Sequence, residues 1–224
     1  MSQQPDTQYD HLPAFERVAS LIRDELIAGQ LHAGQTLVEM DLSERFDTSR
    51  NTVREALRQL LCEGLVTYQR NKGVTVRMME RSDIKDIYII RRTLELQAIS
   101  ASHPLRDYQS DRMLQALEAT ELAREREDWR AVGTHSLQFH QHIVGLLRSP
   151  LFDEFFTNVV AQLRLVFCTA PDESRFQAPW LARDRQIHEL LVEGNKRAAE
   201  EAMGLYLDDS EHQLLQMLAP SSHH

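Results

Sequence analysis

The amino-acid sequence predicts a mostly helical protein in which three helices and a β-hairpin precede an all-helical bundle. Glycine and proline are scarce, at 8 and 7 of 224 residues, which disfavours folds that need many tight turns. Apolar residues recur at helical spacing along most of the chain. The exception lies between residues 65 and 76, where two runs rich in β-branched and aromatic residues flank a short polar turn.

The length and composition exclude several classes of protein. With 42% hydrophobic and 26% charged residues, the chain has the composition of a globular protein of one or two domains. It has no run of 18 apolar residues that could cross a membrane, and its N-terminus lacks the basic and apolar segments of a secretory signal. Cys62 and Cys168 are too few and too far apart for a disulfide scaffold. These features predict a cytoplasmic protein without a membrane partner.

The N-terminal part, residues 10–78, has the element order of a winged helix-turn-helix. Three helices are expected where apolar side chains share one helical face, at residues 14–28, 39–46 and 50–62. Ser49 directly precedes the third of them and is suited to cap its start. Two strands are expected at residues 65–69 and 73–76, joined by a basic tip. In a winged helix-turn-helix, the N-terminal end of the third helix enters the major groove of DNA.

The charge distribution singles out the same segment. The whole chain carries a net charge of −9, but residues 45–77 hold seven basic and three acidic side chains, a local net charge of +4. A basic face on an acidic protein favours DNA binding, although a solvated charged helix would show the same charges. The groove-entering end of the third helix would bring Ser49, Asn51, Thr52 and Arg54 to the DNA, while the hairpin tip follows the backbone or minor groove.

Residues 14–77 closely resemble the DNA-binding domain of the GntR family of bacterial transcription regulators. The most specific matching strings are SRNTVREAL, EGLV and the closing strand GVTV. The resemblance implies that DNA contacts fall at the start of the third helix and on the wing, at Ser49, Arg50, Thr52, Arg54, Arg70, Lys72 and Gly73.

The C-terminal part, residues 79–218, is expected to be helical throughout. Six helices are placed near residues 83–102, 107–127, 129–147, 151–170, 180–193 and 195–217. The polar segment PDESRFQAPW, residues 171–180, is expected to form a loop that could act as a mobile lid. Six helices without a sheet predict a bundle, in which a ligand site would lie between facing helices.

Several polar side chains could line such a site. Arg91 stands four residues before Glu95, so the two form either a surface ion pair or a buried site in which Arg91 binds the carboxylate of a ligand. Ser136 and His140 share one helical face with apolar residues. His188 lies on one later helix, and Tyr206 lies on the inward face of the next. For the histidines and Tyr206, ordinary core packing remains the alternative to ligand binding.

Residues 82–212 resemble the effector-binding domain of the FCD type, which one branch of the GntR family carries and which is related to the fatty-acid-responsive regulator. The strings RRTLE, FH, RQIH and the AM…YL ending match in order. In that branch an Asp and three histidines commonly hold a divalent metal above a carboxylate ligand. The corresponding positions here are Ser136, His140, His188 and Tyr206. Because Ser136 and Tyr206 replace two expected ligands and leave only His140 and His188, a bound metal is disfavoured.

These inferences favour a ligand-responsive transcription regulator that is not an enzyme. The expected form is a homodimer that binds a pseudo-palindromic operator in double-stranded DNA and acts as a repressor. The expected effector is a small anionic metabolite, bound by Arg91, Ser136, His140, His188 and Tyr206 in a metal-free pocket. A metal-dependent enzyme is disfavoured because no complete ligand set, phosphate-binding loop or GxSxG motif is present. A DNA-binding protein without a ligand is disfavoured by the polar residues that face the bundle.

Overall fold

A computed structural model describes residue 9 and residues 11–102, 104–169 and 172–218. Residue 10, the expected start of the DNA-binding domain, lies outside the described residues. The chain divides into two compact units, Met1–Met78 and Met79–His224, and each is described by itself. Among the described residues, no helix is long and apolar enough to cross a membrane.

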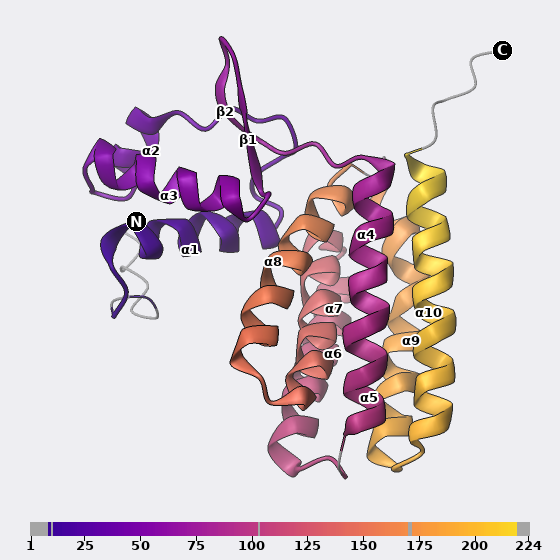
Figure 1. The fold of residues 1–224 in the computed structure, drawn as a ribbon. Coiled ribbons are helices and arrows are strands. Elements are labelled where there is room, and N and C mark those ends of the chain that lie inside the picture. Colours follow the sequence, from indigo (N-terminus) through magenta and orange to yellow (C-terminus); the bar gives the residue numbers. More distant parts are fainter. Residues whose placement is uncertain (1–8, 10, 103, 170–171, 219–224) are drawn as a thin grey trace, which may run out of the picture. The chain divides into compact units, whose positions relative to one another are not determined.

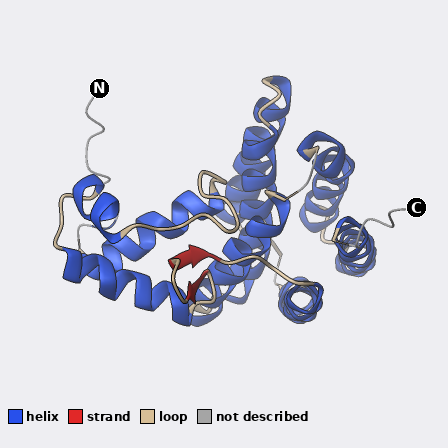
Figure 2. Cartoon of the chain, turned by 90° about the horizontal axis from the view of Figure 1, so that it is seen from above, coloured by secondary structure: helices blue, strands red, loops and turns tan. Residues whose placement is uncertain are grey.

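The first unit contains the expected helices and hairpin (Figure 1). They are α1 (Ala14–Ile27), α2 (Glu39–Arg45), α3 (Arg50–Cys62), β1 (Val66–Gln69) and β2 (Gly73–Val76). The two strands pair antiparallel, with Val66 opposite Val76 and Gln69 opposite Gly73, and they are the red ribbons of Figure 2. Three helices followed by a two-stranded wing confirm the winged helix-turn-helix.

The core of this unit lies between α1 and α3. Val18, Ile22 and Leu26 of α1 are buried, and α1 packs along α3. On α3 the buried side chains follow the spacing i, i+3, i+4 and i+7, which leaves the opposite face of the helix in solvent. That exposed side carries Arg50, Arg54 and Arg58, so the packing of α3 leaves three of the arginines of the basic segment at the surface.

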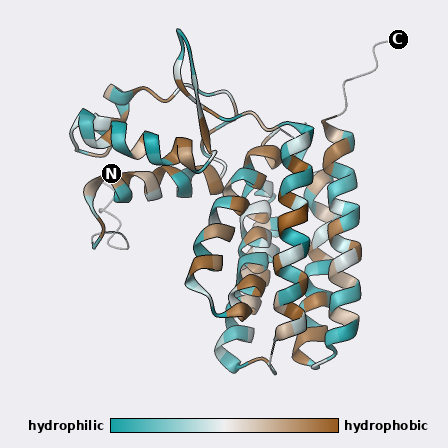
Figure 3. Cartoon of the chain, viewed as in Figure 1, coloured by the Kyte–Doolittle hydropathy of each residue, from teal (hydrophilic) through white to brown (hydrophobic). Residues whose placement is uncertain are grey.

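The second unit is a bundle of long helices (Figure 1). Its elements are α4 (Arg81–Arg91), a π-helical turn η2 (Arg92–Leu96), α5 (Gln97–Ala101), α6 (Asp107–Glu125), α7 (Trp129–Val144), a 3-10 turn η3 (Gly145–Leu147), α8 (Pro150–Phe167), α9 (Glu173–Val192) and α10 (Lys196–Met217). Figure 3 shows apolar and polar residues alternating along these helices, as expected for helices with one buried face. The all-helical bundle is therefore confirmed.

The expected lid over residues 171–180 is wrong where the structure describes it. Residues 173–180 form the first turns of α9, while Pro171 lies outside the described residues. The Asp172 side chain caps the helix by accepting a hydrogen bond from the Arg175 amide at 3.1 Å. Pro179 lies inside the helix, where proline is normally unfavourable. Burial of Phe176 and Trp180 offsets that cost, because both side chains pack into the bundle core.

The sequence also gave no sign of the π-helical turn η2, which interrupts the first long helix of the bundle. Such turns are rare and occur frequently at functional sites. This one contains Glu95, whose side chain is fully buried among the bundle helices. The π-helical turn therefore contributes a charged side chain to the bundle core.

Candidate functional site

The predicted DNA-contacting residues lie on one helix end and one hairpin tip. Ser49 caps α3, since its hydroxyl accepts a hydrogen bond from the Thr52 amide at 3.1 Å. Arg50, Asn51 and Arg54 are exposed on the first turns of the same helix. The remaining free amides at this helix end suit a phosphate oxygen, because the helix dipole is positive there.

The hairpin tip presents two cations on a tight turn. Arg70 and Lys72 are both exposed. Asn71 and Gly73 have positive φ angles of 71° and 77°, a conformation that glycine adopts without strain. The turn therefore presents two exposed basic side chains, Arg70 and Lys72, at the tip of the hairpin.

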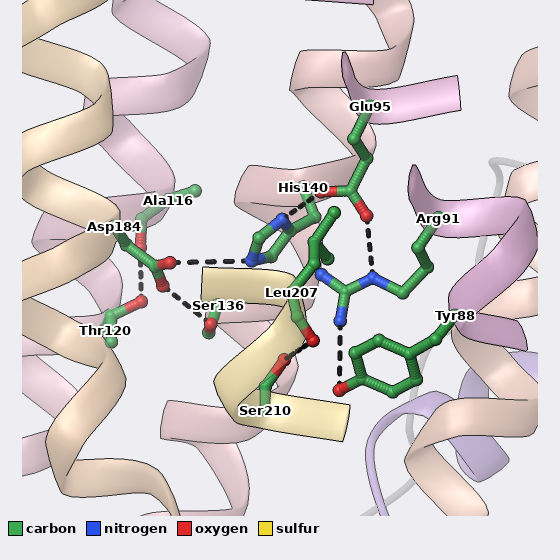
Figure 4. Close-up of polar contacts among 10 residues, drawn as sticks. All are labelled: Tyr88, Arg91, Glu95, Ala116, Thr120, Ser136, His140, Asp184, Leu207 and Ser210. Carbon is green, nitrogen blue, oxygen red and sulfur yellow. Dashed lines mark hydrogen bonds and ion pairs between the residues drawn. The ribbon is translucent and has the colours of Figure 1, made fainter. Parts of the chain in front are cut away.

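A second candidate site lies in the core of the bundle, where charged side chains form a connected chain (Figure 4). Glu95 lies between Arg91 and His140. One carboxylate oxygen accepts a hydrogen bond from Arg91 Nε at 2.6 Å, and the other lies 2.5 Å from His140 Nδ1. Side-chain exposure is 3% for Arg91, 0% for Glu95 and 1% for His140. The hypothesis of a surface ion pair at Arg91 is therefore wrong, because the pair is buried.

Asp184 of α9 continues this chain on the other side of His140. Its Oδ1 lies 3.5 Å from His140 Nε2, and its Oδ2 accepts a hydrogen bond from the Ser136 hydroxyl at 2.7 Å. The Tyr206 ring packs on His140, with ring centroids 4.8 Å apart, and also on Trp180 at 4.9 Å. Side chains of alternating charge thus lie next to one another in the bundle core from Arg91 to Asp184, and aromatic rings pack beside them.

The burial of these groups and their mutual contacts shift their acidities. Burial alone would raise the pKa of Glu95, but Arg91 and His140 together hold it below its ordinary value of 4.5. Burial alone would lower the pKa of His140, but the Glu95 carboxylate and Asp184 hold it above 6.5. Burial, with the charge of Asp184, raises the pKa of Tyr206 well above 10, so its phenol stays neutral. Relative to the free side chains, the contacts therefore favour the ionised form of Glu95 and the protonated form of His140.

Several polar atoms in and beside this cluster are buried without a hydrogen-bond partner. They are Arg91 Nη2, His140 Nε2, Gln177 Nε2, Trp180 Nε1 and Asp184 Oδ1. Two of these atoms, His140 Nε2 and Asp184 Oδ1, face each other at 3.5 Å, and the other three are nitrogens that can donate a hydrogen bond. A buried donor without an acceptor costs free energy, so this surplus of donors needs an explanation.

The structure brings together four of the five side chains predicted for the effector pocket: Arg91, Ser136, His140 and Tyr206. The fifth, His188, lies instead against α6, where its Nε2 is 3.2 Å from the Ser110 hydroxyl. Sequence reasoning missed Asp184, one helical turn before His188. Asp184 and the apolar residue Ile187 are both buried on α9. A single acidic residue on this buried face was the signal available in the sequence.

The cluster does not offer a complete ligand set for the divalent metal that the FCD resemblance implies. The two metal-coordinating atoms that lie close together in the cluster are His140 Nε2 and Asp184 Oδ1. Ser136 already donates its proton to Asp184, and the neutral phenol of Tyr206 is a poor ligand. Among the described residues, no group of three His, Cys, Asp or Glu side chains could hold a metal ion. Two good donors do not complete a coordination shell of four to six ligands.

Comparison with protein families identifies both units. Residues 14–76 match the model of the bacterial regulatory proteins of the gntR family, and residues 86–209 match the FCD domain. The second match alone covers more than half of the chain. The chain belongs to the GntR family. It is a regulator with a GntR-type helix-turn-helix and an FCD domain, and its family is one of transcriptional regulators, not enzymes.

Individual relatives agree with this assignment. A crystal structure of a GntR transcriptional regulator from Rhodococcus sp. RHA1 is 36% identical, has a TM-score of 0.85 and covers 92% of this chain and 99% of its own. The Uxu operon transcriptional regulator of Escherichia coli (strain K12) is 24% identical over 90% of this chain and 87% of its own. The HTH-type transcriptional repressor RspR of the same organism is 23% identical over 88% and 87%.

Other matches are confined to part of the chain. BphR of Paraburkholderia xenovorans (strain LB400), an HTH-type transcriptional regulator, is 37% identical over 81 residues, which span 33% of that protein. The comparisons therefore assign the family of this regulator without identifying its effector.

Proposed function

We propose that this regulator is a cytoplasmic, homodimeric repressor of an operon, and that a small anionic metabolite changes its affinity for the operator. The DNA-binding part of the proposal rests on the exposed arginines of α3 and on the basic hairpin tip, at Ser49, Arg50, Asn51, Thr52, Arg54, Arg70, Lys72 and Gly73. Repression is supported by the repressor RspR, which aligns along most of the chain. A homodimer would read two related half-sites of the DNA.

The observation that carries the effector part is the surplus of buried donors in the FCD bundle. Among the described residues of the bundle, Arg91 Nη2, Gln177 Nε2 and Trp180 Nε1 have no acceptor, and His140 Nε2 has only Asp184 Oδ1, 3.5 Å away, whereas Gln213 Oε1 is the one acceptor without a facing donor. A ligand rich in acceptor oxygens, such as an organic acid, would satisfy these donors. A cationic ligand would bring further hydrogen-bond donors, and no acceptors, to these groups.

The proposed pocket is metal-free, and each of its residues has a stated role. Arg91 donates to a carboxylate of the effector through Nη2, since Nε bonds to Glu95 and Nη1 to the Tyr88 hydroxyl. His140 donates through Nε2, and Ser136 and Tyr206 line the pocket with hydroxyl groups. His188 is left out of this set, because its ring bonds to Ser110.

A ligand screen by thermal shift tests the effector class. The full-length protein is stripped with a chelator and melted with a panel of small organic acids, and the panel is repeated after zinc or manganese is restored. A ligand at about 100 times its dissociation constant stabilises the folded state by about 2.7 kcal/mol, which raises the melting temperature by several degrees. A shift in the stripped protein supports the metal-free pocket, whereas a shift only after metal is restored contradicts it.

The same ligand then tests the link to DNA. An operator duplex is obtained by selection from genomic fragments with the purified protein, and its affinity is measured with and without the ligand. By linkage, the ligand must change operator affinity by the factor by which the operator changes ligand affinity. Arg91→Ala is expected to abolish this response and to leave binding of the free protein to DNA unchanged. A variant that still responds would remove Arg91 from the pocket.

A further inference from the structure

Arg54 on the exposed face of α3 is held by an acidic residue of the neighbouring helix. Glu39, the first residue of α2, accepts hydrogen bonds from Arg54 Nε at 3.1 Å and from Arg54 Nη2 at 2.8 Å. The two side chains remain 36% and 50% exposed, so the pair lies at the surface that α3 offers to DNA. Two parallel bonds between a carboxylate and a guanidinium fix the plane of the guanidinium as well as its position.

The bonds to Glu39 leave one edge of the guanidinium of Arg54 free. Of its five N–H groups, Glu39 takes the one on Nε and one on Nη2. The free edge carries N–H groups of Nη1 and Nη2 side by side. Two adjacent donors of this kind match O6 and N7 of guanine in the major groove, which is the commonest specific contact of arginine with a base.

Glu39 also lies in the field of the other arginines on this face. The hydrogen bonds from Arg54, and the charges of Arg54, Arg50 and Arg58, hold the pKa of Glu39 below its ordinary value. Glu39 therefore stays ionised at neutral pH. Its negative charge opposes the approach of a DNA phosphate, so it weakens the contacts that any DNA sequence could make with Arg54.

We propose that Glu39 determines DNA specificity by orienting Arg54 towards a guanine edge and by keeping Arg54 from binding phosphate. Glu39 is thus a positioning residue that acts through Arg54. The inference rests on the proposed contact of Arg54 with DNA, and it adds a residue outside the third helix and the wing to those that set sequence preference.

The test compares affinities for two DNA duplexes. One duplex is enriched by the wild-type protein from a random pool, and the other has the same length and base composition in scrambled order. Fluorescence anisotropy at several salt concentrations gives both affinities for the full-length wild type and for Glu39→Gln. The matched control is Glu55→Gln, which makes the same change of charge and removes the negative partner of Arg58 from the 2.6 Å ion pair on α3.

Glu39→Gln is expected to lower the ratio of selected to scrambled affinity about tenfold, largely by strengthening binding to the scrambled duplex. Glu55→Gln is expected to leave this ratio within about twofold. In an Arg54→Gln background, Glu39→Gln should have no further effect on the ratio, because the residue through which it acts is gone.

Two results would overturn the inference. One is a Glu39→Gln protein whose two affinities change by the same factor, which would indicate a contribution to stability or net charge alone. The other is a loss of selectivity that persists without Arg54. If the wild type enriches no sequence from the pool, the proposed function itself fails, so the two failures are distinguishable.

Discussion

Glu95→Gln removes one charge from the buried cluster and keeps the shape of the side chain. In the wild type, Glu95 is the counter-ion of Arg91, and both side chains are almost fully buried, at 0% and 3% exposure. The glutamine can still accept a hydrogen bond from Arg91 Nε, but it cannot balance the charge of the guanidinium. Removing one partner of a buried ion pair costs about 3–5 kcal/mol, because the other charge is left uncompensated.

The retained hydrogen bond places the expected cost near the lower end, at about 3 kcal/mol. The unit that contains Glu95 spans Met79–His224. For a domain of this size, each kcal/mol lowers the melting temperature by about 3 °C, so the expected loss is roughly 10 °C. Circular dichroism at 222 nm in a thermal ramp at neutral pH measures this loss, since the unit is helical.

Two further variants separate the effect of the buried charge from that of a lost side chain. Glu121→Gln breaks an exposed pair with Arg124, whose side chains are 40% and 45% exposed, and should cost less than about 1 kcal/mol. The double variant Arg91→Met with Glu95→Gln should recover part of the lost stability, because no buried charge is then left unpaired. A Glu95→Gln protein that melts within about 2 °C of the wild type would refute the reasoning.

Three further predictions concern pH, DNA and metal. Ionised Glu95 should stabilise the protein above pH 4.5, and this stabilisation should disappear as the pH falls through the lowered pKa of Glu95. Protonated His140 should stabilise the protein below pH 6.5, and this stabilisation should disappear as the pH rises through the raised pKa of His140. His140→Gln should therefore remove the alkaline part of this pH dependence of the melting temperature, and its persistence would implicate another group. Arg54→Ala should weaken binding to the selected operator by about 1–3 kcal/mol. Lys72→Ala should weaken binding to all sequences evenly and should reduce the slope of log affinity against log salt concentration by about one. In a gel-shift series, a sequence-selective effect of Lys72→Ala would contradict its assignment to phosphate. Chelation followed by dialysis should leave the melting temperature unchanged, because His140 and Asp184 are the converging donors of the cluster, and a drop that zinc reverses would reveal ligands beyond them.

Local patterns in the sequence were sufficient to predict most of the fold. The bounds of α1, α2, α3 and the hairpin follow from apolar spacing, a capping serine and β-branched runs, all of which act over a few residues. The lid was mistaken because Pro179 is a local signal against helix, whereas the burial of Trp180 is a tertiary effect. The π-helical turn had no local signal, because it accompanies the packing of one helix against several others.

The candidate effector site also combines features that the sequence predicts with features that only the packing of the helices decides. Arg91 and Glu95 are four residues apart, and this spacing allowed either a surface pair or a buried one. Only the packing of the bundle decides that the pair is buried and that His140 joins it from α7. Asp184 and His188 lie one turn apart on α9 and share a side of the helix, so sequence spacing could not distinguish which of them faces His140.

The sequence by itself determined the family, the helical character of the chain and the helix and hairpin that carry the basic residues, because these depend on short-range periodicity and on a dense local motif. Only the tertiary structure decided which charges are buried together, which donors lack an acceptor and which acid holds Arg54. The physical reason is that desolvation and ion pairing depend on distances between groups from different helices. Such distances arise only when the helices pack against one another.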